Sequence, residues 1–101
     1  MKLNHSAIAG TLESSDAQVI VEPSDICGIE LELNSSVMQQ YGRQIKETVI
    51  STLNRMNVQN CRIAVKDQGA LECTLKARVE TAVFRAADKN ADYPWEVLLN
   101  E

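Results

Sequence analysis

Residues 28–37 read Gly28-Ile29-Glu30-Leu31-Glu32-Leu33-Asn34-Ser35-Ser36-Val37, and this stretch decides the fold. Up to Leu33, apolar residues alternate strictly with glutamates, so successive side chains point to opposite faces. That alternation predicts a strand over 28–33 with one buried and one solvated face. The period of the apolar residues then changes within a few positions, which predicts that a helix follows the strand directly.

The helix expected after this strand carries one long apolar stripe. Asn34, Ser35 and Ser36 all favour an N-cap position, and Ser36 with Gln39 has the spacing of a capping box. Apolar residues then recur every three or four positions until Asn57: Val37, Tyr41, Ile45, Val49, Leu53 and Met56. The stripe predicts a helix of about five turns that buries a single face.

Three further strands and a second helix are predicted on either side of this unit. Ala7–Glu13 and the β-branched run Ala17–Glu22 precede it, and Cys61, Ile63 and Val65 alternate with polar residues after it. The turn Asp67-Gln68-Gly69 leads into a second apolar stripe, made of Leu71, Leu75, Val79, Ala82, Val83 and Ala86. This spacing predicts a second amphipathic helix.

The element order β-β-β-α-β-α predicts the α+β class. Two helices with single stripes cover one face of a sheet, which gives a two-layer sandwich with a small, mostly antiparallel sheet. We expect the third strand, first helix and fourth strand to form a right-handed crossover. Glu30 and Glu32 then share the solvated face with Arg62 and Lys66. The chain is expected to be one domain over 1–101, with 88–101 as a C-terminal tail.

Composition excludes several classes of partner. The 101 residues carry a net charge of −4, and Lys and Arg are scattered along the chain. Nucleic-acid binders cluster their basic residues, so we expect no nucleic-acid partner. Membrane binding is not expected either, because no apolar run approaches the ~20 residues of a spanning helix. With no apolar run of signal-peptide length and three unpaired, widely spaced cysteines, the chain is expected to be cytoplasmic.

The side chains that usually carry catalysis are scarce. There is one histidine, His5, and the cysteines Cys27, Cys61 and Cys73 lack the close pairing of a zinc site. Glu30 and Glu32 have the spacing of a solvated strand face rather than of an acid–base pair. We therefore expect no catalytic residue and no metal, and a chain that is not an enzyme.

What remains is the connection Glu13-Ser14-Ser15-Asp16 between the first two strands. On composition alone it is an ordinary hairpin turn, since Ser and Asp favour such positions. A serine at a hairpin tip also presents an exposed hydroxyl on a firm base, which an enzyme that attaches a group must reach.

The run Ala9-Gly10-Thr11-Leu12-Glu13-Ser14-Ser15-Asp16 resembles the N-terminal signature of the citrate lyase acyl carrier protein family, the gamma chain of that complex. Further blocks in the right order resemble the family too: Leu33-Asn34-Ser35-Ser36-Val37, Asp67-Gln68-Gly69-Ala70-Leu71-Glu72-Cys73, Lys76-Ala77-Arg78 and Pro94-Trp95-Glu96. The likeness covers essentially the whole chain, except that the apolar residues after Trp95 do not match the family pattern.

The resemblance implies a carrier role. It implies that Ser14 carries a covalent 2'-(5''-phosphoribosyl)-3'-dephospho-CoA, joined by a phosphodiester, whose thiol holds acetyl and then citryl units while citrate is cleaved to acetate and oxaloacetate. Ser15 is the competing hydroxyl. The implied partners are the citrate lyase alpha chain, an acetyl/citryl transferase, and the beta chain, a citryl lyase, besides a prosthetic-group transferase and an acetylating ligase. The alternative is an unmodified scaffold or regulatory subunit of a cytosolic complex.

Two features are candidates for docking surfaces. Cys73, Ala77 and Phe84 lie together on the second helix, opposite its main stripe, and either a partner or a neighbouring helix is expected to cover them. Trp95 either packs on the core of its own chain or anchors in a partner, where tryptophan is enriched.

Overall fold

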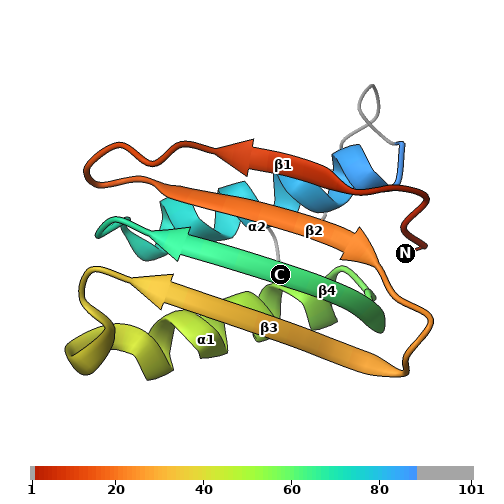
Figure 1. Ribbon diagram of the computed structural model, residues 1–101, viewed down its shortest axis with the longest axis horizontal. Helices are drawn as coiled ribbons and strands as arrows, with labels where there is room; N and C mark the ends of the chain where they lie inside the picture. The colour runs from red at the N-terminus through yellow and green to blue at the C-terminus, as the bar shows by residue number, and fades with distance from the viewer. Residues whose placement is uncertain (1, 89–101) are drawn as a thin grey trace.

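The computed structural model describes residues 2–88 and contains, in that range, a four-stranded sheet and two helices. The elements are β1 (Ala7–Gly10), β2 (Ala17–Pro23), β3 (Gly28–Ser35), α1 (Met38–Arg55), β4 (Asn60–Asp67) and α2 (Glu72–Ala86). Both helices lie behind the sheet in Figure 1, so the molecule has two layers. The predicted α+β class and the order β-β-β-α-β-α are confirmed.

The strands lie in the order β1-β2-β4-β3. β1 with β2 and β2 with β4 are antiparallel, whereas β3 with β4 is parallel. β4 therefore lies between two strands that precede it in the chain, and the sheet is mostly antiparallel, as predicted. The ends of β1 and β4 lie at the same side of the sheet, on the left in Figure 1.

The crossover from β3 through α1 to β4 has the opposite hand to the expected one. In Figure 1 both strands run leftward, β4 lies above β3, and α1 lies behind the sheet, which makes a left-handed turn of the chain. Most parallel crossovers are right-handed. β2 pairs antiparallel with the edge of β4 that faces away from β3, so the two parallel strands belong to a mostly antiparallel sheet.

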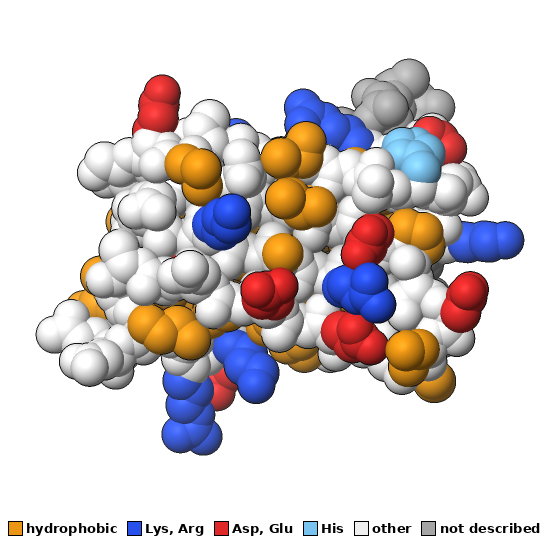
Figure 2. Space-filling model, viewed as in Figure 1, with side chains coloured by type: hydrophobic (Ala, Val, Ile, Leu, Met, Phe, Trp, Pro, Cys, Tyr) orange, Lys and Arg blue, Asp and Glu red, His pale blue; other side chains and the backbone are white. Residues whose placement is uncertain are grey.

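The core fills the space between the sheet and the helices. In β2 and β4 every second residue is buried, among them Val19, Val21, Ile63 and Val65. The helices contribute the stripes that the sequence predicts, including Ile45, Val49, Leu53, Leu75, Val79 and Val83. On the opposite, solvated face Arg62 donates to Glu30 and Glu22 at 3.2 and 3.1 Å, as the alternation of β3 and β4 indicates. Figure 2 shows this face, on which acidic and basic side chains lie beside one another.

Three local predictions are corrected. β1 ends at Gly10, not at Glu13, because residues 11–16 form a loop held by side chains. α1 has Val37 as its N-cap with no side-chain cap, so the Ser36–Gln39 capping box does not form. Instead the Ser35 hydroxyl accepts the Val37 N–H at 3.1 Å. Leu71 lies before α2 as its N-cap and is 70% exposed, outside the buried stripe.

The candidate docking face on α2 is not one surface. Cys73 and Ala77 are exposed, but Phe84 is fully buried in the core. Trp95 and positions 89–101 of the expected tail lie outside the described residues. Within residues 2–88, neither helix is long and apolar enough to cross a membrane.

Candidate functional site

The loop between β1 and β2, residues 11–16, presents both candidate serines at one end of the sheet. Ser14 and Ser15 are exposed, and neither hydroxyl has a hydrogen-bond partner among residues 2–88. The loop continues a hairpin whose strands pair from Ala7–Val21 to Gly10–Gln18. The loop therefore exposes two serine hydroxyls on a backbone that is fixed by the paired strands below it.

A tight turn sets the direction of the two serines. The Asp16 N–H donates to the Glu13 carbonyl at 3.2 Å, which closes a turn over residues 13–16. Ser15 has φ +66°, in the left-handed region that favours glycine and asparagine. Its N–H donates to the carbonyl of Gln68 at 2.7 Å, and the Gln68 N–H donates back to the Asp16 carbonyl at 2.8 Å. The backbone of the serine loop is thus tied to the loop between β4 and α2.

Asp16 holds the inside of the serine loop together. Its carboxylate accepts the Thr11 hydroxyl at 2.7 Å, the Thr11 N–H at 3.2 Å and the Ala17 N–H at 2.7 Å. Arg78 of α2 donates to both carboxylate oxygens, at 2.9 and 3.1 Å. The Arg78 hydrogen bonds, followed by those from Thr11 and Ala17, hold the pKa of Asp16 well below its usual range. The carboxylate stays ionised, and the fork geometry fixes its orientation.

Gly10 lets the loop leave β1 at this angle. Its φ is +85°, and a Cβ built there would lie 1.8 Å from the Ala17 carbonyl oxygen. No other residue fits so close an approach of two backbone segments. The glycine of the signature is therefore required by the loop conformation.

The neighbouring β4–α2 loop is organised by a second aspartate. Asp67 is buried and accepts the Gly69 and Ala70 N–H groups at 3.2 and 3.0 Å. The Ser35 hydroxyl donates to it at 2.8 Å. One carboxylate thus fixes the end of β4, the end of β3 and the approach to α2. Both oxygens of this buried side chain thus have hydrogen-bond partners, as burial of a polar group requires.

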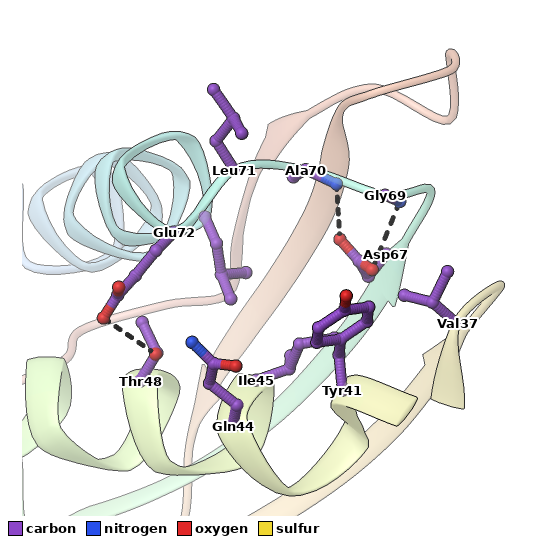
Figure 3. A pocket seen from close by; sticks show the side chains of 11 residues that line it. Val37, Tyr41, Gln44, Ile45, Thr48, Asp67, Gly69, Ala70, Leu71 and Glu72 are labelled. Carbon is purple, nitrogen blue, oxygen red and sulfur yellow. Dashed lines mark hydrogen bonds between the residues drawn. The ribbon is translucent and has the colours of Figure 1, made fainter. Parts of the chain in front are cut away.

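A groove lies beside this second loop, between the first turns of α1 and α2. Its volume is about 320 Å³. Figure 3 shows Tyr41, Gln44, Ile45 and Thr48 on α1 facing the segment Gly69–Glu72 across it. Apolar side chains dominate the lining: Val37, Tyr41, Ile45, Ala70, Leu71 and Leu75. The apolar spacing of α1 predicts that Tyr41 is buried in the core. In the structure Tyr41 is 50% exposed and lines the groove. We call it the helix groove.

Other reactive side chains are not gathered here. His5 pairs with Asp88 at 2.6 Å, at the far end of β1 from the serine loop. The hydrogen bond with the Ser6 carbonyl, followed by the one with Asp88, raises the pKa of His5. Burial raises the pKa of Cys61 to about 11. Among residues 2–88, no three His, Cys, Asp or Glu side chains form a metal-binding group. The reactive feature that this end of the sheet offers is the pair of serine hydroxyls.

Comparison with known proteins gives the family. Residues 4–86 match the family described as malonate decarboxylase delta subunit (MdcD), an ACP family. A protein of Vibrio cholerae serotype O1 (strain M66-2), called citrate lyase acyl carrier protein, is 51% identical over 88 residues, which are 87% of this chain and 90% of that protein. The chain belongs to the citrate lyase acyl carrier protein family.

Other relatives extend the match to nearly the full length. The citrate lyase acyl carrier proteins of Fusobacterium nucleatum subsp. nucleatum and Haemophilus influenzae (strain PittEE) are 50% and 46% identical. The alignment with the Fusobacterium protein covers 92% of this chain and 98% of that protein. The alignment with the Haemophilus protein covers 98% of this chain and 100% of that protein. The resemblance predicted from the sequence blocks is confirmed.

Solved structures share the fold at low identity. A chain of a Pseudomonas malonate decarboxylase hetero-tetramer in complex with malonate has a TM-score of 0.55 at 18% identity, with 82% of this chain and 84% of that chain covered. Homoserine kinase from Cytophaga hutchinsonii has a TM-score of 0.60 at 10% identity, with 98% and 40% covered. The arrangement of strands and helices therefore occurs in proteins of quite different activity, and fold alone does not give function.

In this acyl carrier family member, sequence reasoning found the serines but missed their supports. Asp16 was seen only as a turn residue, and Arg78 only as part of a matching block. A signal did exist, because an aspartate after a serine turn favours bonds to backbone N–H groups. Its partner 62 positions away has no local signature.

Proposed function

We propose that this protein is an acyl carrier subunit of citrate lyase, modified covalently on Ser14. The observation that carries the proposal is the exposed Ser14 hydroxyl, without a partner among residues 2–88, on a loop braced by Asp16 and Arg78. The names of the relatives support the same role. In a carrier of this kind the prosthetic group supplies the reactive atom, and the protein contributes its presentation.

The prosthetic group is 2'-(5''-phosphoribosyl)-3'-dephospho-CoA, joined to the Ser14 Oγ through a phosphodiester, and its terminal thiol supplies the thioester chemistry that holds acetyl and citryl units. The residues present fit this group, because the Ser14 oxygen is open to solvent and the loop offers no side chain that would have to be displaced. Tethering on a fixed loop raises the effective concentration of the arm at each partner site.

Ser14 is preferred to Ser15 as the attachment site. The resemblance places the attachment directly after the Gly-Thr-Leu-Glu stretch, which ends at Glu13. The backbone of Ser15 has a different task, since its N–H is bonded to Gln68 and its φ is +66°. We infer that Ser15 shapes the turn and Ser14 presents the hydroxyl.

The partners follow from this role. We propose the citrate lyase alpha chain as the acetyl/citryl transferase and the beta chain as the citryl lyase, with a prosthetic-group transferase and an acetylating ligase acting on the free carrier. The chain itself is then non-catalytic and works in the cytoplasm. The alternative, an unmodified scaffold or regulatory subunit, needs no free serine.

The intact mass of the chain, purified from its native host, tests the proposal. We expect the mass of one covalent nucleotide-cofactor adduct, which Ser14→Ala abolishes and Ser15→Gly retains. Glycine is the right control at position 15 because it adopts the positive φ without strain. An unmodified mass in an active complex, or an adduct that moves with Ser15, would contradict the proposal.

A further inference from the structure

We propose that the helix groove seats the pantetheine end of the arm carried by Ser14 while the carrier is between partners. This inference rests on the proposed function, because it takes the covalent group as the occupant. It adds a binding site for that group on the carrier itself, built from α1 and the start of α2, apart from the serine that anchors it.

The groove lies within reach of the anchoring loop. The Ser15 N–H donates to the Gln68 carbonyl and the Gln68 N–H donates to the Asp16 carbonyl, so two backbone hydrogen bonds hold the serine loop against the β4–α2 loop. Leu71, at the groove, is only three positions after Gln68 in the chain, which is about 10 Å of backbone at most. Gly69 leaves the way open, since a Cβ built there would meet nothing within 4 Å. A long arm on Ser14 crosses this segment easily.

The volume of the groove limits how much of the prosthetic group can bind in it. A volume of about 320 Å³ lies at the lower end of small-molecule sites. It accommodates one slender segment, not the nucleotide and the pantetheine together. The walls suit a chain of methylenes and methyl groups, because Ile45, Leu75 and Val37 line them.

The polar groups of the groove favour the uncharged pantetheine end of the arm over its phosphates. Glu72 lies on the lining, and the ionisable Asp67 forms part of it, while the groove has no Lys or Arg. Negative side chains disfavour phosphates, so the pyrophosphate of the arm stays outside. The Tyr41 hydroxyl and the Gln44 amide have no partner within residues 2–88 and face the groove (Figure 3). They offer hydrogen bonds to the two amides of a pantetheine segment.

Nuclear magnetic resonance of the full chain tests the inference without an activity assay. Labelled protein is prepared with and without its prosthetic-group transferase, and intact mass verifies the loading. We expect loading to shift the amide signals of residues 41–48 and 69–72, besides those of the serine loop. Nuclear Overhauser contacts should join arm protons to the methyl groups of Ile45 and Leu75.

A matched pair of variants makes the test specific. Gln44→Trp fills the groove from an exposed position of α1 and should abolish the shifts at 69–72 while leaving those at residues 11–16. Gln39→Trp makes the same change at an exposed position outside the groove and should retain both sets. Loaded protein whose shifts are confined to residues 11–16, or whose groove shifts survive Gln44→Trp, overturns this inference alone. Absence of any adduct in protein from the native host overturns the proposed function and this inference with it.

Discussion

Asp16 shows how much one side chain decides at this site. Its two oxygens bind Thr11, Ala17 and Arg78, so they join the entry of the loop, its exit and a helix that is distant in sequence. The Asp16 side chain is 13% exposed and that of Arg78 is 38% exposed, so water competes only partly for the pair. Because these hydrogen bonds lower the pKa of Asp16, its carboxylate stays ionised at acidic pH values that protonate an ordinary aspartate.

The Arg78–Asp16 pair predicts how acid affects the protein. In the folded chain the pKa of Asp16 lies below the ordinary value of 3.8. The pair therefore adds stability that is complete above the unfolded pKa and is lost as the pH falls through the folded pKa. Arg78→Met should raise the pKa of Asp16 and weaken this acid dependence. Carboxyl-carbon NMR titration of Asp16 measures it.

The bonds from Thr11 and Ala17 remain in that variant, so the pKa of Asp16 should rise only part of the way. Arg62→Met, on the solvated face of the sheet, is the matched control and should leave the titration of Asp16 unchanged. A titration of Asp16 that is the same in the wild type and Arg78→Met would show that the arginine does not hold the loop.

At the scale of elements, the two helices are joined by a mostly buried ion pair. Arg55 at the end of α1 donates to Glu80 of α2 at 3.4 Å, and the Glu80 side chain is 7% exposed. Burial raises the pKa of Glu80, against the opposite effects of Lys76 and Arg55. The effect of desolvation on this pKa is thus larger than that of the two cations. The ion pair mainly offsets part of the free-energy cost of burying the Glu80 carboxylate. The pair lies apart from the helix groove, which is lined by earlier residues of both helices.

Arg55→Met should lower the free energy of unfolding by about 1–3 kcal/mol at pH 7, because it removes one partner of a buried charge. The pKa of Glu80 should rise further in the variant. Since a raised carboxyl pKa costs stability only above that pKa, the loss should shrink as the pH falls through it. Urea unfolding at pH 7 and pH 5 measures both effects.

Arg43→Met is the control for that experiment. It breaks the exposed pair of Arg43 with Glu47 on the same helix and should change stability by less than about 0.5 kcal/mol. If Arg55→Met had as small an effect at both pH values, the buried pair would have no part in joining the helices.

At the scale of the molecule, one core joins both layers within residues 2–88, and Phe84 is the largest fully buried side chain in that range. The spacing of Cys73, Ala77 and Phe84 predicted a shared face on α2, but this face is exposed near the start of the helix and buried near its end. Its start is open beside the helix groove, whereas its end is enclosed. The interpretation of Phe84 as a docking residue was wrong for this reason.

Phe84→Ala should reduce the free energy of unfolding by about 3–5 kcal/mol, the usual cost of truncating a buried aromatic residue. Cys73→Ala, at an exposed position of the same helix, should change it by less than about 0.5 kcal/mol. Denaturant unfolding midpoints give both values. Phe84→Leu guards against loss of folding and should fall between them; equal midpoints for Phe84→Ala and Cys73→Ala would mean that Phe84 is not buried.

Particular residues show how much of the fold and of the site can be predicted from the sequence. The alternation at Ile29, Leu31 and Leu33 predicted β3 and its faces, and the stripe from Ile45 to Leu53 predicted α1. Ser14 was found as an exposed hydroxyl in a turn, although which serine is modified stays a prediction. Tyr41 and Leu71 were misplaced into the core, because periodicity gives the side of a helix but not where its neighbour ends.

The sequence by itself determined the element order, the buried and solvated faces of β3 and β4, and the serine loop with its family signature. These are local properties, set by the spacing of apolar residues and by turn chemistry. Only the tertiary structure decided that β4 lies between β2 and β3, that the crossover is left-handed, that Arg78 braces Asp16, and that a groove opens beside the loop. The physical reason is that these features depend on contacts between distant segments, whose free energy comes from mutual packing and has no trace in any local pattern.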